Sequence, residues 1–178
     1  MISHYNLSQE KIELLVNNLE KIKAAKGRLE LVRKLANGAK IFIDYAHTPD
    51  ALENVLANAA KMPHNKLHVL FGCGGNRDKT KRPQMGKIAC DLADFVIVSD
   101  DNPRHENADV IRDEILKACD LNKTLNIGER REAIHLAMSK LQKDDILILA
   151  GKGHEKYQII GDEKFDLDEE KIVNDFDF

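Results

Sequence analysis

Five short apolar segments alternate with amphipathic segments along most of this chain, and this alternation limits the folds that it can adopt. The apolar segments are predicted strands at residues 40–44, 67–72, 95–99, 125–127 and 146–150. The amphipathic segments between them are predicted helices at residues 50–61, 81–92, 109–119 and 130–141. Strands that alternate with helices are typical of βαβ units, whose right-handed crossovers place helices on both faces of a parallel sheet. We therefore predict an α/β fold with a doubly wound, mostly parallel sheet.

The two ends of the chain depart from this alternation. Residues 8–26 are predicted to form a helix, with Ser8 as its cap and Gly27 as its stop. Residues 155–160 and 164–167 flank a Gly-Asp turn and predict a C-terminal hairpin, which a last helix at 168–174 follows. We place a boundary between residues 26 and 27.

Composition narrows the class of protein and of ligand. A chain of 178 residues suffices for one domain, and no apolar run approaches the roughly 18 residues of a membrane span. Three cysteines without a close pair suit a reducing cytoplasm. The segment 162–178 has a net charge of −6 and the rest of the chain +3. This body is too weakly basic to indicate nucleic acid, so we expect a small anionic ligand, a cytoplasmic location and no membrane partner.

Four loops that follow predicted strands contain most of the unusual residues of the chain. They lie at residues 44–50, 72–78, 100–104 and 151–155. Because ligands bind beyond the carboxyl ends of the strands in an open parallel sheet, we expect these loops to form one site.

The first two loops each allow two interpretations. Asp44 either binds a ribose hydroxyl, as an aspartate at a strand end does in doubly wound folds, or caps its own loop. Thr48 followed by Pro49 is typical of a helix start. Cys73 is expected to pack among small residues rather than to react. The basic side chains of the second loop form either an anion pocket or a solvated face, and they are Arg77, Lys79, Lys81 and Arg82.

The last two loops contain opposite charges. Arg104 can hold a carboxylate through two parallel hydrogen bonds, unless Asp100 and Asp101 hold Arg104 in place. Glu155, on the same rim, supplies the opposite charge that a zwitterion needs. A metal site at the two aspartates is not supported, because no further metal-ligating residues lie at a suitable spacing in the sequence.

Several established motifs are absent from the sequence. Arg77 stands where a dinucleotide fingerprint needs its third glycine, which disfavours a dehydrogenase. The chain contains no P-loop pattern and no Gly-x-Ser-x-Gly elbow. The remaining histidines are predicted to lie at segment ends or on helix surfaces, and the sequence shows no partner pattern for them; they are His4, His64, His68, His105 and His135.

Six motifs, in family order, make the chain resemble the C-terminal domain of the Mur ligase family. They lie at residues 27–30, 44–50, 71–85, 101–104, 150–155 and 157–158. The resemblance implies a Rossmann-like domain of a three-domain, ATP-dependent ligase that forms an amide bond in peptidoglycan synthesis. Residues 1–26 then resemble the tail of the central ATPase domain, and residues 27–178 the amino-acid-binding domain. The ending Lys164-Phe165-Asp166 departs from the usual aromatic-Ser-Asp.

The resemblance also assigns roles to individual residues. It implies that Arg28, Asp44, Tyr45 and His47 bind the nucleotide. It implies that the incoming amino acid is bound by Arg77, Asp101, Asn102, Arg104, Gly151 and Glu155. Among these, Arg77 would hold the carboxylate at the reacting end, Asn102 and Arg104 the far carboxylate, and Gly151 and Glu155 the far ammonium. The Asn-Pro-Arg sequence resembles that of the family members that use meso-diaminopimelate. If the amino acid were lysine, Arg104 would have no far carboxylate to bind.

The missing motifs limit what we expect of this chain alone. ATP is the expected nucleotide, whereas the magnesium site and the contacts to UDP-MurNAc-L-Ala-D-Glu would belong to the other domains. No catalytic residue and no metal site are therefore expected here. We expect that the chain alone forms no peptide bond, as an excised domain or the distal part of a split ligase. The alternatives are a non-catalytic module that binds diaminopimelate or nucleotide, and a folylpolyglutamate-synthase-like domain.

Overall fold

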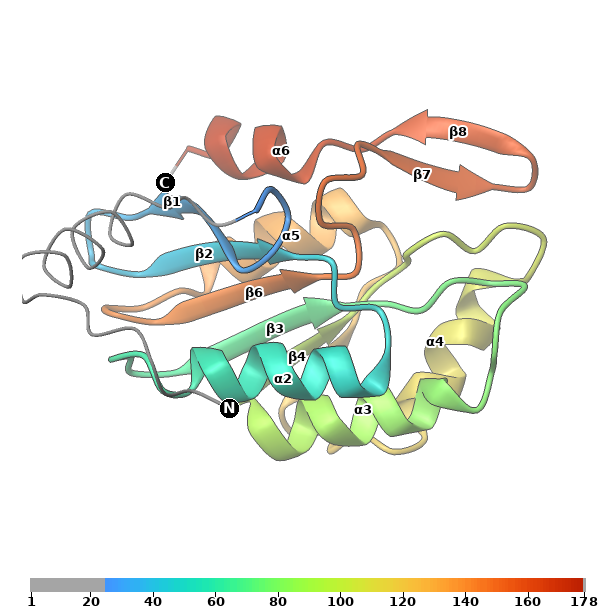
Figure 1. Cartoon of the computed structure of the whole chain (residues 1–178), viewed down its shortest axis with the longest axis horizontal. Coiled ribbons are helices and arrows are strands. Elements are labelled where there is room, and N and C mark those ends of the chain that lie inside the picture. Colours follow the sequence, from blue (N-terminus) through green and yellow to red (C-terminus); the bar gives the residue numbers. More distant parts are fainter. Residues whose placement is uncertain (1–24, 178) are drawn as a thin grey trace, which may run out of the picture.

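The computed structural model describes residues 25–177, and these form a six-stranded sheet with helices on both faces and a separate hairpin (Figure 1). The strand order is β1-β2-β6-β3-β4-β5. Strands β2 to β6 are parallel, and β1 is antiparallel to β2. The strands are β1 (Glu30–Lys34), β2 (Lys40–Asp44), β3 (Leu67–Phe71), β4 (Phe95–Val98), β5 (Thr124–Asn126) and β6 (Ile146–Ala150). The predicted doubly wound α/β fold is confirmed, and the predicted helix at 8–26 lies outside the described residues.

Helices cover both faces of the sheet because side chains of a strand alternate between its faces. Ile146 and Ile148 belong to the core beneath the first group of helices, whereas Leu147 and Leu149 belong to the opposite core. The first group is α2 (Pro49–Ala59), α3 (Lys81–Leu92) and α4 (Ala108–Leu116). The second group is α5 (Arg130–Ser139) and α6 (Glu169–Asp175). Figure 1 shows α2 and α3 side by side along one face.

The predicted boundaries agree with these elements to within three residues. Helix α2 begins as expected, since the Thr48 side chain accepts a hydrogen bond from the Ala51 amide and Pro49 occupies the first turn. Three helices end earlier than predicted because their last turns tighten. Cys119 N, for example, donates to Leu116 O, three residues back, instead of continuing the α-helical pattern.

Strand β1 and the turn after it escaped the sequence prediction. Its residues are only partly buried at one edge of the sheet, and its pairing shifts register between Leu31 and Arg33. Gly38 closes the turn at a positive φ of 89°, and its amide donates to Leu35 O. An edge strand with a bulge and polar side chains lacks the apolar run that identifies the buried strands.

The predicted hairpin is present as β7 (Tyr157–Ile160) and β8 (Glu163–Asp166). It extends past the carboxyl ends of the parallel strands (Figure 1). Its first strand forms a bridge with the loop after β4, where Arg104 N donates to Ile159 O at 3.0 Å and Gly161 N donates to Arg104 O at 2.8 Å. The hairpin therefore helps to build the rim on which the site is predicted. No helix in the described part of the chain is long and apolar enough to cross a membrane.

The prediction that His68 lies at a segment end or on a helix surface is wrong. His68 is buried in β3, and its Nε2 lies 3.1 Å from Asp145 Oδ2. Asp145 also accepts hydrogen bonds from Asn65 Nδ2, Lys66 N and Gln142 N, and so ties together the loops that enter β3 and β6. The two residues are 77 positions apart in sequence, so no local pattern relates them.

We expect this buried pair to make folding sensitive to acid. Burial lowers the pKa of His68, and Asp145 only partly offsets this. In the unfolded chain, His68 therefore takes up a proton near pH 6.5, whereas in the folded chain it stays neutral to lower pH. The free energy of unfolding consequently falls as the pH drops below about 6.5. His68→Gln retains an N–H donor but cannot titrate, so it should lose less stability between pH 7.5 and pH 5.5. Urea unfolding at both pH values tests this, and equal losses in the two proteins would contradict it.

Candidate functional site

Eight of the ten predicted site residues line one pocket of about 370 Å³ at the carboxyl edge of the sheet. This pocket, hereafter the rim pocket, lies among the loops that follow β2, β3, β4 and β6. Its lining residues are Tyr45, His47, Gly74, Arg77, Lys81, Asp101, Asn102, Arg104, Gly151 and Glu155. The four loops therefore meet in space, as the parallel sheet predicts.

The rim pocket presents both signs of charge. Arg77, Lys81 and Arg104 supply cations, and Asp101 and Glu155 supply carboxylates. Asn102 lies between them and donates from Nδ2 to Glu155 Oε2 at 3.4 Å. Such a lining complements a small molecule that carries separated carboxylate and ammonium groups.

Arg104 is held by its backbone and by one nitrogen of its side chain. Its φ of 52° is in the left-handed region, which the two backbone bonds to the hairpin stabilise. Nη1 donates to Gly75 O at 3.0 Å and to Asn102 O at 3.3 Å. The alternative that the two aspartates hold Arg104 is wrong, since Asp100 pairs with Arg112 and Asp101 lies 3.8 Å from Lys152 Nζ.

Close backbone contacts fix the loops that follow β3 and β4. Gly75 N donates to Asn102 O at 2.9 Å, and a Cβ on Gly75 would lie 1.9 Å from Pro103 O. Only glycine permits this approach. Cys73, just before this turn, is buried against Met85, and burial raises the pKa of its thiol to about 12. Its predicted packing role is confirmed.

The basic residues of the second loop do not share one role. Arg77 and Lys81 line the rim pocket, but Arg82 is fully buried and bonded to Glu106 and Glu114. Burial alone would raise the pKa of Glu106, yet hydrogen bonds from Lys79, the Asn76 amide and Arg82 hold that pKa at about 2. Arg82 therefore supports the loop beneath the pocket instead of belonging to a solvated face.

Gly151 permits the tight turn that follows β6. Its φ is 115°, and a Cβ there would lie 2.6 Å from Asp101 Oδ2. Its amide is not free for a ligand, because it donates to Asp44 O at 3.0 Å. The carbonyl of Gly151 remains the backbone group that could face a ligand.

Asp44 and Arg28 are the two predicted residues that do not line the rim pocket. Asp44 is buried, and its two oxygens accept hydrogen bonds from Leu29 N and Ala46 N, each at 2.7 Å. Its loop-capping interpretation is confirmed, and its contact with a ribose stays a prediction. The Arg28 guanidinium lies 5.1 Å from the Tyr45 ring centroid. Tyr45 in turn contacts the rings of His47 and His154, which gives an aromatic surface beside the pocket.

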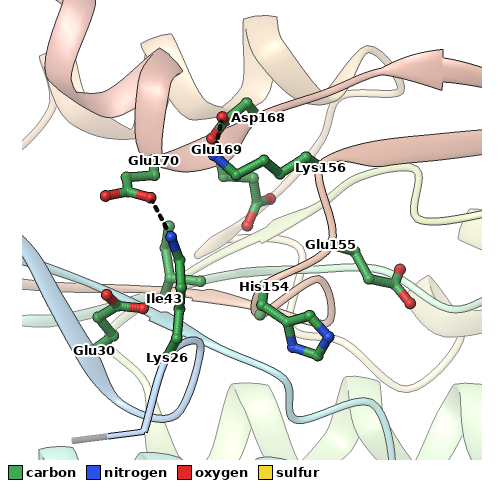
Figure 2. A pocket seen from close by; sticks show the side chains of 10 residues that line it. Lys26, Glu30, Ile43, His154, Glu155, Lys156, Asp168, Glu169 and Glu170 are labelled. Atoms are coloured by element: carbon green, nitrogen blue, oxygen red, sulfur yellow. Dashed lines mark hydrogen bonds and ion pairs between the residues drawn. The ribbon is translucent and has the colours of Figure 1, made fainter.

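A second, smaller pocket lies between the segment before β1 and the start of α6 (Figure 2). Ion pairs join Lys26 to Glu170 at 3.2 Å and Lys156 to Asp168 at 2.6 Å across its edge. The Lys26 pair is largely exposed, and exposed pairs each contribute at most about 1 kcal/mol. Part of the acidic C-terminal segment is therefore bound to the basic body of the domain.

Comparison with known proteins places this fold in a family. The sequence profile described as "Mur ligase, glutamate ligase domain" matches residues 27–153. The chain belongs to this family. The rim pocket of this Mur ligase domain thus lies within or directly beside the matched region.

Relatives of this Mur ligase domain carry the name UDP-N-acetylmuramoyl-L-alanyl-D-glutamate–2,6-diaminopimelate ligase. The protein from Rickettsia bellii is 53% identical over 162 residues, which is 90% of this chain and 33% of the relative. The protein from Mesorhizobium japonicum is 54% identical over 145 residues, which is 82% of this chain and 30% of the relative. The chain thus spans about a third of the length of these relatives.

Solved structures agree with this assignment. A structure of a ligase with the same name has a TM-score of 0.79 and 39% identity, and it covers 90% of this chain and 33% of its own. Mycobacterium tuberculosis folylpolyglutamate synthase has a TM-score of 0.58 at 19% identity, over 72% of this chain and 30% of its own. The second likeness shows a shared fold alone.

Sequence reasoning missed one buried residue of the Mur ligase domain's site. Lys152 is the second residue after β6, and its buried Nζ lies 2.5 Å from Asn102 Oδ1. Its place between two glycines after an apolar strand gives no signal of burial, because the acceptors that a buried lysine needs come from distant parts of the chain. Within residues 25–177, no group of three or more His, Cys, Asp or Glu side chains is arranged to hold a metal ion.

Proposed function

We propose that this Mur ligase domain binds meso-diaminopimelate for an ATP-dependent ligase that adds it to UDP-N-acetylmuramoyl-L-alanyl-D-glutamate. The observation that carries the proposal is the rim pocket, where Arg77 and Arg104 share one cavity with Glu155. Meso-diaminopimelate is an amino acid at both ends, so it needs two carboxylate sites and a site for the ammonium that does not react. The relatives' names support this choice of substrate.

Each end of the substrate has its own partners in this proposal. Arg77 binds the carboxylate at the reacting end. Arg104 and the Asn102 amide bind the far carboxylate, and Glu155 with the Gly151 carbonyl binds the far ammonium. These contacts leave the reacting amino group directed toward the acceptor. Fixing the amine in this way removes much of the entropic barrier to amide formation.

The nucleotide side of the proposal rests on the aromatic surface beside the pocket. Arg28, Tyr45 and His47 contact ATP, with Asp44 near its ribose. ATP, when bound by the whole enzyme, supplies the phosphate that activates the acceptor carboxylate, and that phosphate leaves as the amide forms. In this proposal the Mg²⁺ ligands belong to the rest of the enzyme. The enzyme works in the cytoplasm, which suits the three free thiols of this chain.

Selectivity against lysine follows from the same contacts. Lysine lacks the far carboxylate, so the remaining N–H donors of Arg104 and the closer acceptor for the Asn102 amide would go unmatched in the occupied pocket. An unpaired buried polar group costs about 1–3 kcal/mol, more for a charged one. A site built to bind a group rejects the analogue that lacks it.

A chimera tests the proposed function. This chain would replace the corresponding third of the Rickettsia bellii ligase, and ligation to UDP-N-acetylmuramoyl-L-alanyl-D-glutamate would be measured with diaminopimelate and with lysine. We expect ATP-dependent ligation of diaminopimelate at more than about 100 times the rate with lysine. The chain alone should show no ligation, since it contains no P-loop pattern.

Other outcomes would favour the alternative functions. A folded chimera that is inactive, combined with tight diaminopimelate binding by the chain alone in calorimetry, would favour a non-catalytic binding module. Ligation of glutamate in place of diaminopimelate would favour the folylpolyglutamate-synthase-like alternative. Ligation by the isolated chain would disprove its expected inactivity.

A further inference from the structure

Lys152 is a fully buried lysine at the base of the rim pocket. Its Nζ lies 2.5 Å from Asn102 Oδ1 and 2.9 Å from Tyr157 O, and 3.8 Å from Asp101 Oδ1. Burying a lysine is costly unless its N–H groups are paired. Here they are paired with the loop after β4 and with the first residue of the hairpin.

Asn102 receives two hydrogen bonds on the same side-chain oxygen. Besides Lys152, the backbone N–H of Ile159 donates to Asn102 Oδ1 at 2.9 Å. An amide N–H and a lysine ammonium are donors without acceptor capacity, so a flipped Asn102 would direct its own NH₂ group at two donors. The network therefore determines which end of the amide faces the rim pocket.

The opposite end of the Asn102 amide is thus turned toward the ligand space. Nδ2 donates to Glu155 Oε2 at 3.4 Å, a long bond that a closer acceptor would displace. An amide that presents N–H groups favours a carboxylate at this position and disfavours an ammonium. Gln158 Nε2 adds to the rigidity of the same loop by donating to Asp101 O at 2.7 Å.

We propose that Lys152 is a positioning residue, which holds Asn102 so that the N–H donors of its amide, and not its oxygen, face the substrate. The inference rests on the proposed function, because it makes this wall of the pocket a carboxylate site. Lys152 does not touch the substrate. Its contact with Tyr157 O also fastens the hairpin whose backbone holds Arg104, so one buried side chain orients both groups of the far-carboxylate site.

The first test needs no ligand and no variant. In the ¹⁵N-labelled 178-residue chain, nuclear Overhauser effects should connect the Asn102 Nδ2 protons to the Glu155 side chain. The Ile159 amide proton, which points at Oδ1, should show only weak contacts with them. Strong contacts between the Asn102 NH₂ group and the Ile159 amide would mean the opposite orientation and overturn the proposal, even if Lys152→Met fails to fold.

The second test compares Lys152→Met with Lys156→Met. Each variant removes one lysine amine, and the two lysines are four positions apart. Lys156, however, is exposed and pairs with Asp168 away from the rim pocket. We expect Lys152→Met to weaken meso-diaminopimelate binding about tenfold in calorimetry, with lysine binding changed less than about threefold. The Asn102 amide should also show a second, flipped set of resonances. Lys156→Met should change neither.

The outcomes separate this inference from the proposed function. A folded Lys152→Met chain with unchanged diaminopimelate affinity and a single Asn102 amide orientation would overturn the positioning role. An equal loss for diaminopimelate and lysine would assign Lys152 a merely structural role. If the unaltered chain binds no diaminopimelate, as is expected where the other domains complete the site, KM for diaminopimelate and for lysine in the chimera replaces the calorimetry. The Asn102 contacts test the orientation in either case.

Discussion

Replacing Arg104 with alanine is expected to lower kcat/KM for diaminopimelate about 100-fold and to change KM for ATP less than about threefold. The proposed far-carboxylate site loses its guanidinium, whereas the aromatic surface that we propose to face the nucleotide is untouched. The measurement uses the chimera, with diaminopimelate and ATP varied in turn. Arg104 also supports Gly75 O through Nη1, so thermal unfolding must accompany the kinetics.

Two further variants isolate the chemistry of Arg104. Arg104→Lys keeps the charge but not the planar pair of donors, so we expect an intermediate loss of about tenfold. Arg131→Ala removes an exposed arginine at the start of α5 and should leave both constants unchanged. Equal losses for diaminopimelate and ATP in Arg104→Ala would contradict the assignment of Arg104 to the amino acid.

Replacing Arg130 with methionine is expected to lower the free energy of unfolding by about 3–5 kcal/mol. Arg130 and Glu169 form a pair 2.7 Å apart whose side chains are 0% and 1% exposed. Removal of the arginine leaves a buried carboxylate whose Oε2 already has no hydrogen-bond partner among the described residues. Urea unfolding at pH 7.5 measures the loss.

The double variant Arg130→Met/Glu169→Leu is the matched control. It removes both charges and fills the space with apolar side chains, so most of the lost stability should return. A loss below about 1 kcal/mol in the single variant would show that water or backbone movement compensates the carboxylate. Arg130 also donates to Ala150 O at 2.8 Å, so the pair supports the end of β6 directly under the rim pocket.

Much of the fold could be predicted because its signal is local. Strands β2 and β6 and helix α3 have the predicted bounds, since each is a clear apolar or amphipathic run between polar loops. The location of the site could be predicted from the same strand assignment, because parallel strands bring the loops after β2, β3, β4 and β6 to one edge of the sheet. Eight predicted residues meet there without any local pattern that relates one loop to another.

The features that the prediction lacked depend on partners far along the chain. His68 and Asp145, and Lys152 and Asn102, are 77 and 50 positions apart. A buried charged residue looks in sequence like a surface residue, as Arg82 did, until the acceptors around it are known. Edge strand β1 could not be predicted for a similar reason. Its pairing with β2, and not its composition, makes it a strand.

The sequence by itself determined the α/β alternation, the four loops on one rim and, by resemblance, the family. These depend on residue periodicity and short motifs, which the chain carries whatever its tertiary contacts. Only the tertiary structure decided that Asp44 caps its loop, that Arg82 and Lys152 are buried, and that the Asn102 amide turns its N–H groups toward the pocket. Each of these depends on which donors and acceptors meet once water is excluded, because a buried polar group must be paired by whatever the fold places beside it.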